Sequence, residues 1–226
     1  MNNLLNAEIM VFQQKLNGHV MLFNYRMMNL CVKAEPAALM PATIHLADGS
    51  YNIEDTANIE KPDDYHFKIT PKNPNNMPNV IEGIFEIHPE FKIEEGSEKN
   101  ALDKVVHFLT YEMPYVDKDR RDLLNETTKG FHKECIARLD TEMAAQTATF
   151  VDMLVHAPAA EADEARRMIQ QIYDDTKDSA DDLLKAKLVE IEDGYQRYLK
   201  EQEKEKIKEA ENFDYSKGMR LSYGDE

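Results

Sequence analysis

The side chains able to do chemistry are abundant in this chain, but their spacing forms no catalytic or metal-binding motif. The seven histidines form no HxxxH or HExxH pair, and Cys31 and Cys135 form no CxxC pair. A GxSxG elbow, a Walker loop and a glycine-rich dinucleotide turn are absent as well. His66 and His107 could face one another on adjacent strands, but further metal ligands are missing. We therefore expect a non-enzymatic protein without metal ion or cofactor, and with reduced, buried thiols.

The residues with the clearest potential for binding are basic. A series of them recurs on one predicted helix: Arg120, Arg121, Lys129, Lys133 and Arg138. Arginine and lysine at such positions can contact RNA phosphates, which position a protein without reading the base sequence. The alternative is an ordinary solvated helix face, because Glu126 and Glu134 lie close enough to neutralise part of the series.

The chain as a whole is acidic, with a formal net charge of -16 over 226 residues. This charge opposes non-specific attraction to nucleic acid, so an RNA partner must be bound through a local patch. Such a patch is possible because charges are screened over about 8 Å at physiological salt. The N-terminus lacks a basic segment followed by an apolar core, and no run of about 18 apolar residues occurs. These features predict a cytoplasmic protein without a membrane segment.

Three stretches have the apolar periodicity of long amphipathic helices. The first begins near residue 5, reaches Cys31 and stops before Pro36. The second begins at Asp117 and ends near Pro158, and an acidic connector at residues 159–165 leads to the third. Their roughly heptad spacing favours packing of the three helices against each other as a bundle.

Between the first two helices the period changes to that of β-strands. A hairpin is predicted at residues 42–47 and 50–53, because alternating segments flank an Asp-Gly turn. Further strands are predicted at residues 64–70 and 105–111, with a helix beginning near Pro78 between them. The predicted fold class is therefore α+β, with a small α/β module of β/α/β type inserted between helices one and two. The bundle comprises residues 1–36 and 116–200, and the module residues 37–115.

The junction at residues 113–121, Met-Pro-Tyr-Val-Asp-Lys-Asp-Arg-Arg, marks the end of a strand and the start of a helix. Pro114 favours an extended Met113, and Asp117 can cap the helix that follows. Prolines also flank the other segment that crosses between the modules. Pro36, Pro41, Met113 and Pro114 are thus the predicted residues of a double-stranded hinge.

Residues 201–226 form a C-terminal extension. Residues 200–208 are polar on every face and favour continuation of the third helix, whereas the last residues lack any period and favour a flexible end. The alternative is a docking peptide for a protein partner, anchored by Phe213, Tyr215 and Tyr223.

Several short motifs resemble those of ribosome recycling factors, in the same order from about residue 5 to residue 200. The junction at residues 113–121 resembles the family's Pro-Leu-Thr-Glu-Glu-Arg-Arg, and Lys33-Ala-Glu-Pro36 resembles Gly-Arg-Ala-Ser-Pro. Lys129-Gly130 falls on the family's Arg-Gly, and Glu164-Ala-Arg-Arg167 resembles Asp-Asp-Arg-Arg. The order and spacing of these motifs together carry the resemblance.

The resemblance implies a translation factor whose bundle binds the large ribosomal subunit, while elongation factor G pushes on the small module to split the subunits. On this basis the expected rRNA phosphate contacts are Lys33, Arg120, Arg121, Lys129 and Lys133. The chain departs from the family in one respect, because arginines of the second helix are replaced by Asp140, Met143 and Ala144. A second interpretation is therefore a non-catalytic protein-interaction module that kept the fold and lost ribosome binding.

Overall fold

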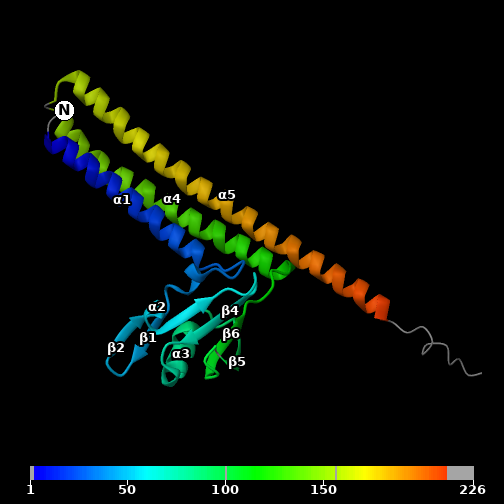
Figure 1. The fold of residues 1–226 in the computed structure, drawn as a ribbon. Helices are drawn as coiled ribbons and strands as arrows, with labels where there is room; N and C mark the ends of the chain where they lie inside the picture. Colours follow the sequence, from blue (N-terminus) through cyan, green and yellow to red (C-terminus); the bar gives the residue numbers. More distant parts are fainter. Residues whose placement is uncertain (1–2, 100, 156, 213–226) are drawn as a thin grey trace, which may run out of the picture.

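Three long helices pack side by side in the computed structural model, which describes residues 3–99, 101–155 and 157–212 (Figure 1). They are α1 (Asn3–Met28), α4 (Lys118–Leu154) and α5 (Ala159–Asn212). A smaller β-rich module is inserted between α1 and α4 and lies beside the end of the bundle where α1 ends and α4 begins. The predicted α+β class and the insertion between the first two helices are confirmed. None of the described helices is both long and apolar enough to cross a membrane.

The bundle core consists of the apolar stripes that the sequence predicts. Residues of α1 that lie three, four or seven positions apart are buried in this core, including Leu5, Phe12 and Leu16. Phe12 meets Phe150 of α4 edge to face, with ring centroids 5.8 Å apart. Because each helix is apolar on the stripe that faces its neighbours, the three helices exclude water along their shared axis.

The predicted connector at residues 159–165 is wrong, because α5 begins at Ala159 and follows α4 after a short turn. Alanine and glutamate are strong helix formers. The segment is therefore helical, although its acidic residues had indicated a connector. Ala162 and Ala165 are buried in the bundle core, where small side chains let α5 approach its neighbours closely. At its other end α5 continues to Asn212, beyond the point where α4 begins (Figure 1). Phe213, Tyr215 and Tyr223 of the predicted docking peptide lie outside the described residues.

The inserted module combines two antiparallel sheets with one main helix. The first sheet is a hairpin of β1 (Thr43–Leu46) and β2 (Gly49–Asn52). After the short helices η1 (Pro36–Leu39) and α2 (Ile53–Thr56), the second sheet has the order β3-β4-β6-β5. Its strands are β3 (Ala57–Glu60), β4 (His66–Pro71), β5 (Lys92–Lys99) and β6 (Val105–Glu112), with η2 (Pro74–Asn76) and α3 (Met77–Ile87) between β4 and β5.

The core of the module forms where β4, β6 and α3 meet. Phe67 and Ile69 alternate with more exposed residues along β4, and Leu109 and Tyr111 oppose them on β6. On the helix side, a Cβ at Gly83 of α3 would lie 2.6 Å from the backbone oxygen of Thr43, so only glycine permits this contact with β1. The module therefore has its own hydrophobic core, separate from that of the bundle.

His66 and His107 lie apart in the sheet of the module, and both cysteines are buried. His66 lies opposite Glu112 in the β4–β6 ladder, whereas His107 lies opposite Ser97 on β5. The prediction that the two histidines face one another is therefore wrong, because the strand register places them far apart along β6. Cys31 and Cys135 are both free and buried, as predicted.

Candidate hinge and basic surface

Two segments of chain connect the bundle to the module. The first crossing, residues 29–42, runs from α1 to β1, and the second crossing, residues 113–117, runs from β6 to α4. Both are held by the same loop. In the first crossing, Ala34 N donates a 2.7 Å hydrogen bond to Asp64 O. In the second crossing, Met113 N donates a 2.8 Å hydrogen bond to Tyr65 O. Because Asp64 and Tyr65 are adjacent in the loop that leads into β4, the two crossings are fixed at neighbouring points of the module.

The bundle packs against both crossings through a small hydrophobic cluster. Val32 of the first crossing and Val116 of the second are buried together with Leu124 of α4 and Ile191 of α5. Gly194 lies beside them, and a Cβ at this position would be only 2.7 Å from Val32 Cγ1 and 3.2 Å from Val116 Cγ2. The absence of a side chain at Gly194 thus lets both crossings lie against α5.

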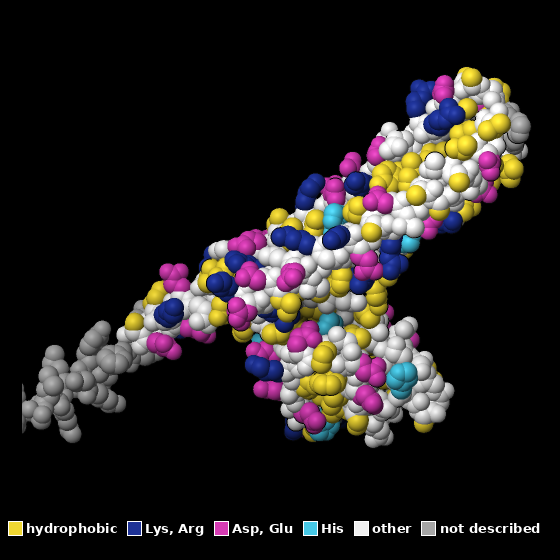
Figure 2. Space-filling model, turned by 180° about the vertical axis from the view of Figure 1, so that it is seen from behind, with side chains coloured by type: hydrophobic (Ala, Val, Ile, Leu, Met, Phe, Trp, Pro, Cys, Tyr) yellow, Lys and Arg dark blue, Asp and Glu magenta, His cyan; other side chains and the backbone are white. Residues whose placement is uncertain are grey.

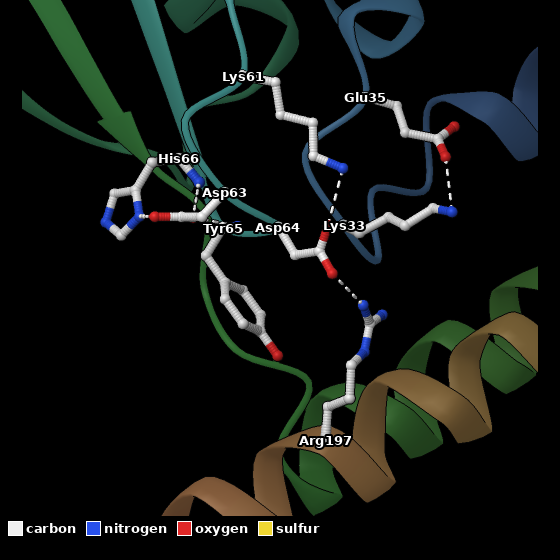
Figure 3. A network of polar contacts seen from close by, with 8 residues as sticks. All are labelled: Lys33, Glu35, Lys61, Asp63, Asp64, Tyr65, His66 and Arg197. Atoms are coloured by element: carbon white, nitrogen blue, oxygen red, sulfur yellow. Dashed lines mark hydrogen bonds and ion pairs between the residues drawn. The ribbon is translucent and has the colours of Figure 1, made fainter.

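An ion pair joins α5 to the module directly (Figure 3). The Arg197 guanidinium donates to Asp64 Oδ2 at 2.9 Å, and Lys61 Nζ lies 2.8 Å from Asp64 Oδ1. These two cations hold the pKa of the Asp64 carboxyl below its usual value, with Lys61 the larger influence. One carboxylate of the module is therefore shared between a lysine of its own loop and an arginine of the bundle.

Three tyrosines lie next to this ion pair. The Tyr65 and Tyr115 rings are 4.6 Å apart, and the Tyr115 and Tyr198 rings are 6.2 Å apart. They come from the loop before β4, the second crossing and α5. Aromatic contact at these distances adds to the ion pair in holding the module against the bundle.

A buried histidine at the end of α3, His88, also contacts the first crossing, and no sequence motif pointed to it. His88 Nε2 lies 3.0 Å from Ala38 O and 3.7 Å from Cys31 Sγ, while Nδ1 lies 3.2 Å from Glu90 Oε1. Burial alone would lower the pKa of His88, but its hydrogen bonds with Cys31, Glu90 and Ala38 raise the pKa to about 10. Both ring nitrogens face acceptors, and only the protonated imidazolium can donate to both.

The predicted hinge residues occupy different environments. Pro36 begins η1 within the first crossing, and Pro41 follows that helix just before β1. Met113 is fully buried in the module core, and Pro114 follows it in the second crossing. Motion between the modules stays a prediction.

Arg120 points into the junction rather than outward. Its guanidinium donates a 3.1 Å hydrogen bond to Cys31 O, which ties the first turn of α4 to the crossing that follows α1. Burial lowers the pKa of Arg120, and the nearby Glu90 carboxylate opposes that change. The start of the helix is set by Asp117, whose side chain accepts a 2.8 Å hydrogen bond from Arg120 N. The predicted N-cap is confirmed.

Arg121 is engaged by neighbours on its own helix and on α5. Its guanidinium donates to Asp122 at 2.8 Å, lies 3.9 Å from Glu192 Oε2, and sits 4.4 Å above the Tyr195 ring. The two carboxylates compensate part of its charge.

The remaining predicted contacts differ in how much of their charge is compensated. Lys33 pairs with Glu35 at 2.8 Å, and this carboxylate raises the pKa of Lys33. Lys129 and Lys133 are exposed and four residues apart, so they share one face of α4. Within residues 3–99, 101–155 and 157–212, no carboxylate pairs with either lysine. The structure thus brings Lys129 and Lys133 together, but it places Lys33, Arg120 and Arg121 elsewhere.

Acidic side chains interrupt the basic series, as the sequence suggested. Glu134 pairs with Arg138 at 2.8 Å and with Arg26 of α1 at 2.6 Å. Figure 2 shows the same mixture on a larger scale, because lysines and arginines alternate with acidic side chains along the bundle. The basic residues therefore do not form one continuous strip on that face.

The residues that connect the modules were missed by sequence reasoning. Asp64, Arg197 and Tyr198 are polar or aromatic residues without a motif, and only the folded chain brings them together. Gly194 did carry a signal, because a glycine inside a helical pattern often marks a close approach of another segment.

No protein-family model matches the sequence, and no curated protein matches it significantly. The fold, in contrast, matches solved structures. The solution structure of the ribosome recycling factor superposes with a TM-score of 0.68 at 15% sequence identity, covering 85% of this chain and 100% of that one. A structure of the T. thermophilus ribosome recycling factor and E. coli elongation factor G bound to the E. coli post-termination complex matches with a TM-score of 0.54 at 16% identity, covering 83% and 98%. The chain therefore has the fold of the ribosome recycling factors.

Proposed function

We propose that this protein is a ribosome-recycling-factor-like translation factor, which binds the large ribosomal subunit and assists splitting of the subunits after termination. The observation that carries the proposal is the fold match over 100% of the length of a ribosome recycling factor, with both modules included. The short motifs at the two crossings support it, because they stand in the same order in the chain. The cytoplasm, where such a factor would act, is the proposed location.

Lys129 and Lys133 are the proposed contacts to rRNA phosphates. They are exposed, lie on one face of α4, and have no carboxylate partner among the described residues. Lys33 could add a third contact after exchanging Glu35 for a phosphate. Arg120 and Arg121 contribute instead at the junction, where Arg120 donates a hydrogen bond to the first crossing and Arg121 forms an ion pair with Glu192 of α5.

Elongation factor G is the proposed protein partner. A ribosome recycling factor and elongation factor G are bound to the same post-termination complex in one of the matching structures. If elongation factor G pushes on the small module here, the module must turn relative to the bundle. The Arg197–Asp64 ion pair is then one of the contacts that this movement has to break.

Sedimentation with purified large ribosomal subunits, at about 50 mM and about 200 mM salt, tests the proposal. We expect binding that weakens as salt rises, because each phosphate contact releases counterions. Replacing both Lys129 and Lys133 by Ala should reduce the salt slope by about 2, or about 1 for each lysine. The matched control replaces the exposed Lys92 and Lys99 of the small module by Ala, which removes the same charge and should leave binding unchanged. Absence of binding at both salt concentrations contradicts the proposal.

A non-catalytic protein-interaction module is the second candidate function. The observation that favours it lies on the distal half of α4, where Asp140 accepts a hydrogen bond from Tyr173 of α5. This bond raises the pKa of Tyr173 to about 12, so the site presents an acid and a neutral phenol where the family has arginine. An rRNA phosphate would be repelled there. Failure to sediment with ribosomal subunits would favour this second function.

A further inference from the structure

A cleft with a volume of about 280 Å³ lies where the second crossing, the small module and α5 meet. We call it the hinge cleft. Six of its lining residues are polar or aromatic: Glu90, Lys92, Glu112, Tyr115, Asp117 and Tyr198. Three carboxylates against one lysine make the hinge cleft a site that favours a cation over an anion.

Glu112 is the carboxylate of the hinge cleft that is most available to a ligand. Asp117 caps α4, and Glu90 contacts His88. Glu112 has only Lys92, at 3.5 Å, and the Lys92 side chain is 78% exposed. An exposed pair of this kind contributes at most about 1 kcal/mol. A cation that is better placed can therefore replace Lys92.

The tyrosines beside the hinge cleft also leave polar groups unused. Tyr65 is 8% exposed and packs on Tyr115, and its hydroxyl has no hydrogen-bond partner in the described part of the chain. Figure 3 shows the Tyr65 side chain pointing from the module towards α5. Burial raises the pKa of Tyr115 most, followed by carboxylates on three elements: Glu201, Glu112, Glu205 and Asp63. The charges with the largest effect on Tyr115 are therefore all negative.

An acidic track leads from the end of α5 back to the hinge cleft. Glu201, Glu205 and Glu209 follow Tyr198 at spacings of three or four, so the four residues share one face of α5. Among the described residues, no lysine or arginine forms an ion pair with these three glutamates. At about 100° per residue, the lysines of residues 200–208 all lie about 65° or more from the middle of this face. The track is thus a line of uncompensated carboxylates.

The C-terminal segment of the same chain has the charge and the length to cover this track. Residues 215–223, which lie beyond the described part of the chain, contain two cations and no acid in the sequence YSKGMRLSY. Tyr198 precedes Asn212, the last residue of α5, by about 21 Å at 1.5 Å per residue. Arg220 follows Asn212 by eight residues, which can span about 26 Å at roughly 3.3 Å per residue. Arg220 can therefore reach the hinge cleft.

The spacing of the two cations also fits. In extended chain, Lys217 and Arg220 are about 10 Å apart at roughly 3.3 Å per residue. Glu205 and Tyr198 are separated by about the same distance along α5 at 1.5 Å per residue. Lys217 on Glu205 therefore places Arg220 at Tyr198, at the edge of the hinge cleft. An arginine there can stack on a tyrosine ring and donate to a carboxylate at the same time.

We propose that residues 215–223 turn back along α5 and dock on the acidic track and the hinge cleft of their own chain, with Arg220 bound by Glu112 and Tyr198. A docked segment contacts the bundle and the module together, so it restricts movement between them. The proposal does not depend on ribosome binding, because it concerns the free protein.

Pulsed electron paramagnetic resonance of the full chain tests the proposal, with spin labels at Ser222→Cys and at Ser97→Cys on β5. Both native cysteines are buried, so the labels attach to the introduced ones. We expect a narrow distance distribution at physiological salt. It should broaden at about 1 M salt, where charges are screened over about 3 Å.

Charge reversal identifies the contact. Arg220→Glu should abolish the narrow distribution, and adding Glu112→Arg to that variant should restore it, because the pair is then re-formed with opposite signs. Glu164→Arg is the matched control. It makes the same change of charge at an exposed residue near the start of α5, and it should leave the distribution unchanged.

Four outcomes would overturn the proposal. The first is a broad distribution in the labelled, otherwise unmodified chain at physiological salt. The second is a narrow distribution that survives Arg220→Glu or is lost equally in Glu164→Arg. The third is failure of Glu112→Arg to restore the distribution, in a double variant whose circular dichroism shows intact helices. The fourth is a narrow distribution that disappears when labelled chains are diluted with unlabelled ones, because the segment then docks on a second copy.

Discussion

Arg197 and Asp64 form a 2.9 Å ion pair between α5 and the module, although 133 residues separate them in the chain. The same carboxylate is paired with Lys61 inside the module, so Asp64 is held in place for Arg197. The contact is partly exposed, and pairs of this kind contribute about 0.2 to 1 kcal/mol each. Its effect on stability is small, whereas its position across the junction lets it influence the angle between the modules.

Arg197→Ala is expected to widen the range of module orientations, because it removes the direct ion pair between α5 and the module. Spin labels at Ser97→Cys on β5 and Ser179→Cys on α5 would report this as a broader distance distribution in pulsed electron paramagnetic resonance. Lys61→Ala is the matched control, since it removes a cation from Asp64 but keeps the contact with Arg197. Identical distributions in all three proteins would contradict the expectation.

Gly194→Ala is expected to destabilise the protein by about 1 to 3 kcal/mol, a usual cost of overpacking. The new methyl group would lie 2.7 Å from Val32 Cγ1, which cannot move without shifting the first crossing. Urea denaturation gives the free energy of unfolding. Gly130→Ala provides the comparison, because its Cβ meets no described atom and the better helix propensity of alanine should stabilise α4 by up to about 1 kcal/mol. Equal effects of the two substitutions would contradict the role assigned to Gly194.

Local signals in the sequence predicted the helices and the junction, because the interactions behind them span only a few residues. Asp117 caps the amide of Arg120, three positions away, and the structure shows this bond. The strand β5 was missed for the opposite reason. Its sequence, KIEEGSEK, has little alternation and several strongly polar residues, and only pairing with β6 makes it a strand. The Arg197–Asp64 pair could not be predicted, because the two residues are 133 positions apart and the local partner of Asp64, Lys61, does not point to Arg197.

The candidate binding residues were predictable as a series of charges but not as a surface. Helical spacing alone separates Arg120 from Lys129 by about half a turn, because nine residues correspond to roughly 180°. The carboxylate partners of Arg121, by contrast, include Glu192 of another helix, which only the fold brings close. Composition therefore indicates how many charges are available, and packing decides which of them remain free.

Asp117→Ala is expected to reduce the free energy of unfolding by about 1 kcal/mol, the usual effect of losing an N-cap. The substitution leaves the amide of Arg120 without its acceptor at the first turn of α4. Asp152→Ala, near the other end of α4, removes the same charge without removing a cap. It should be neutral or slightly stabilising, because a negative charge is unfavourable near a helix C-terminus. Chemical denaturation of both variants makes the comparison, and a loss in Asp152→Ala as large as in Asp117→Ala would contradict the capping role.

Protonation of His88 is expected to make stability depend on pH. The pKa of His88 is raised to about 10, because its hydrogen bonds with Cys31, Glu90 and Ala38 outweigh the opposing effect of burial. The folded state therefore holds a proton that the unfolded state releases near pH 6.5. The contribution is fully present below about pH 6.5 and is lost progressively as pH rises towards 10.

The free energy of unfolding, measured between pH 6 and pH 9, should fall with rising pH in the unmodified chain and fall less steeply in His88→Gln. Burial also raises the pKa of the Cys135 thiol, which adds a decline of the same sign at the alkaline end. Cys135 is present in both proteins, so the difference between their slopes isolates His88. His132→Gln is the control, because His132 contacts Asp181 at 2.6 Å in the bundle and lies away from the junction. A slope in His88→Gln equal to that of the unmodified chain would show that His88 is not protonated in the folded state.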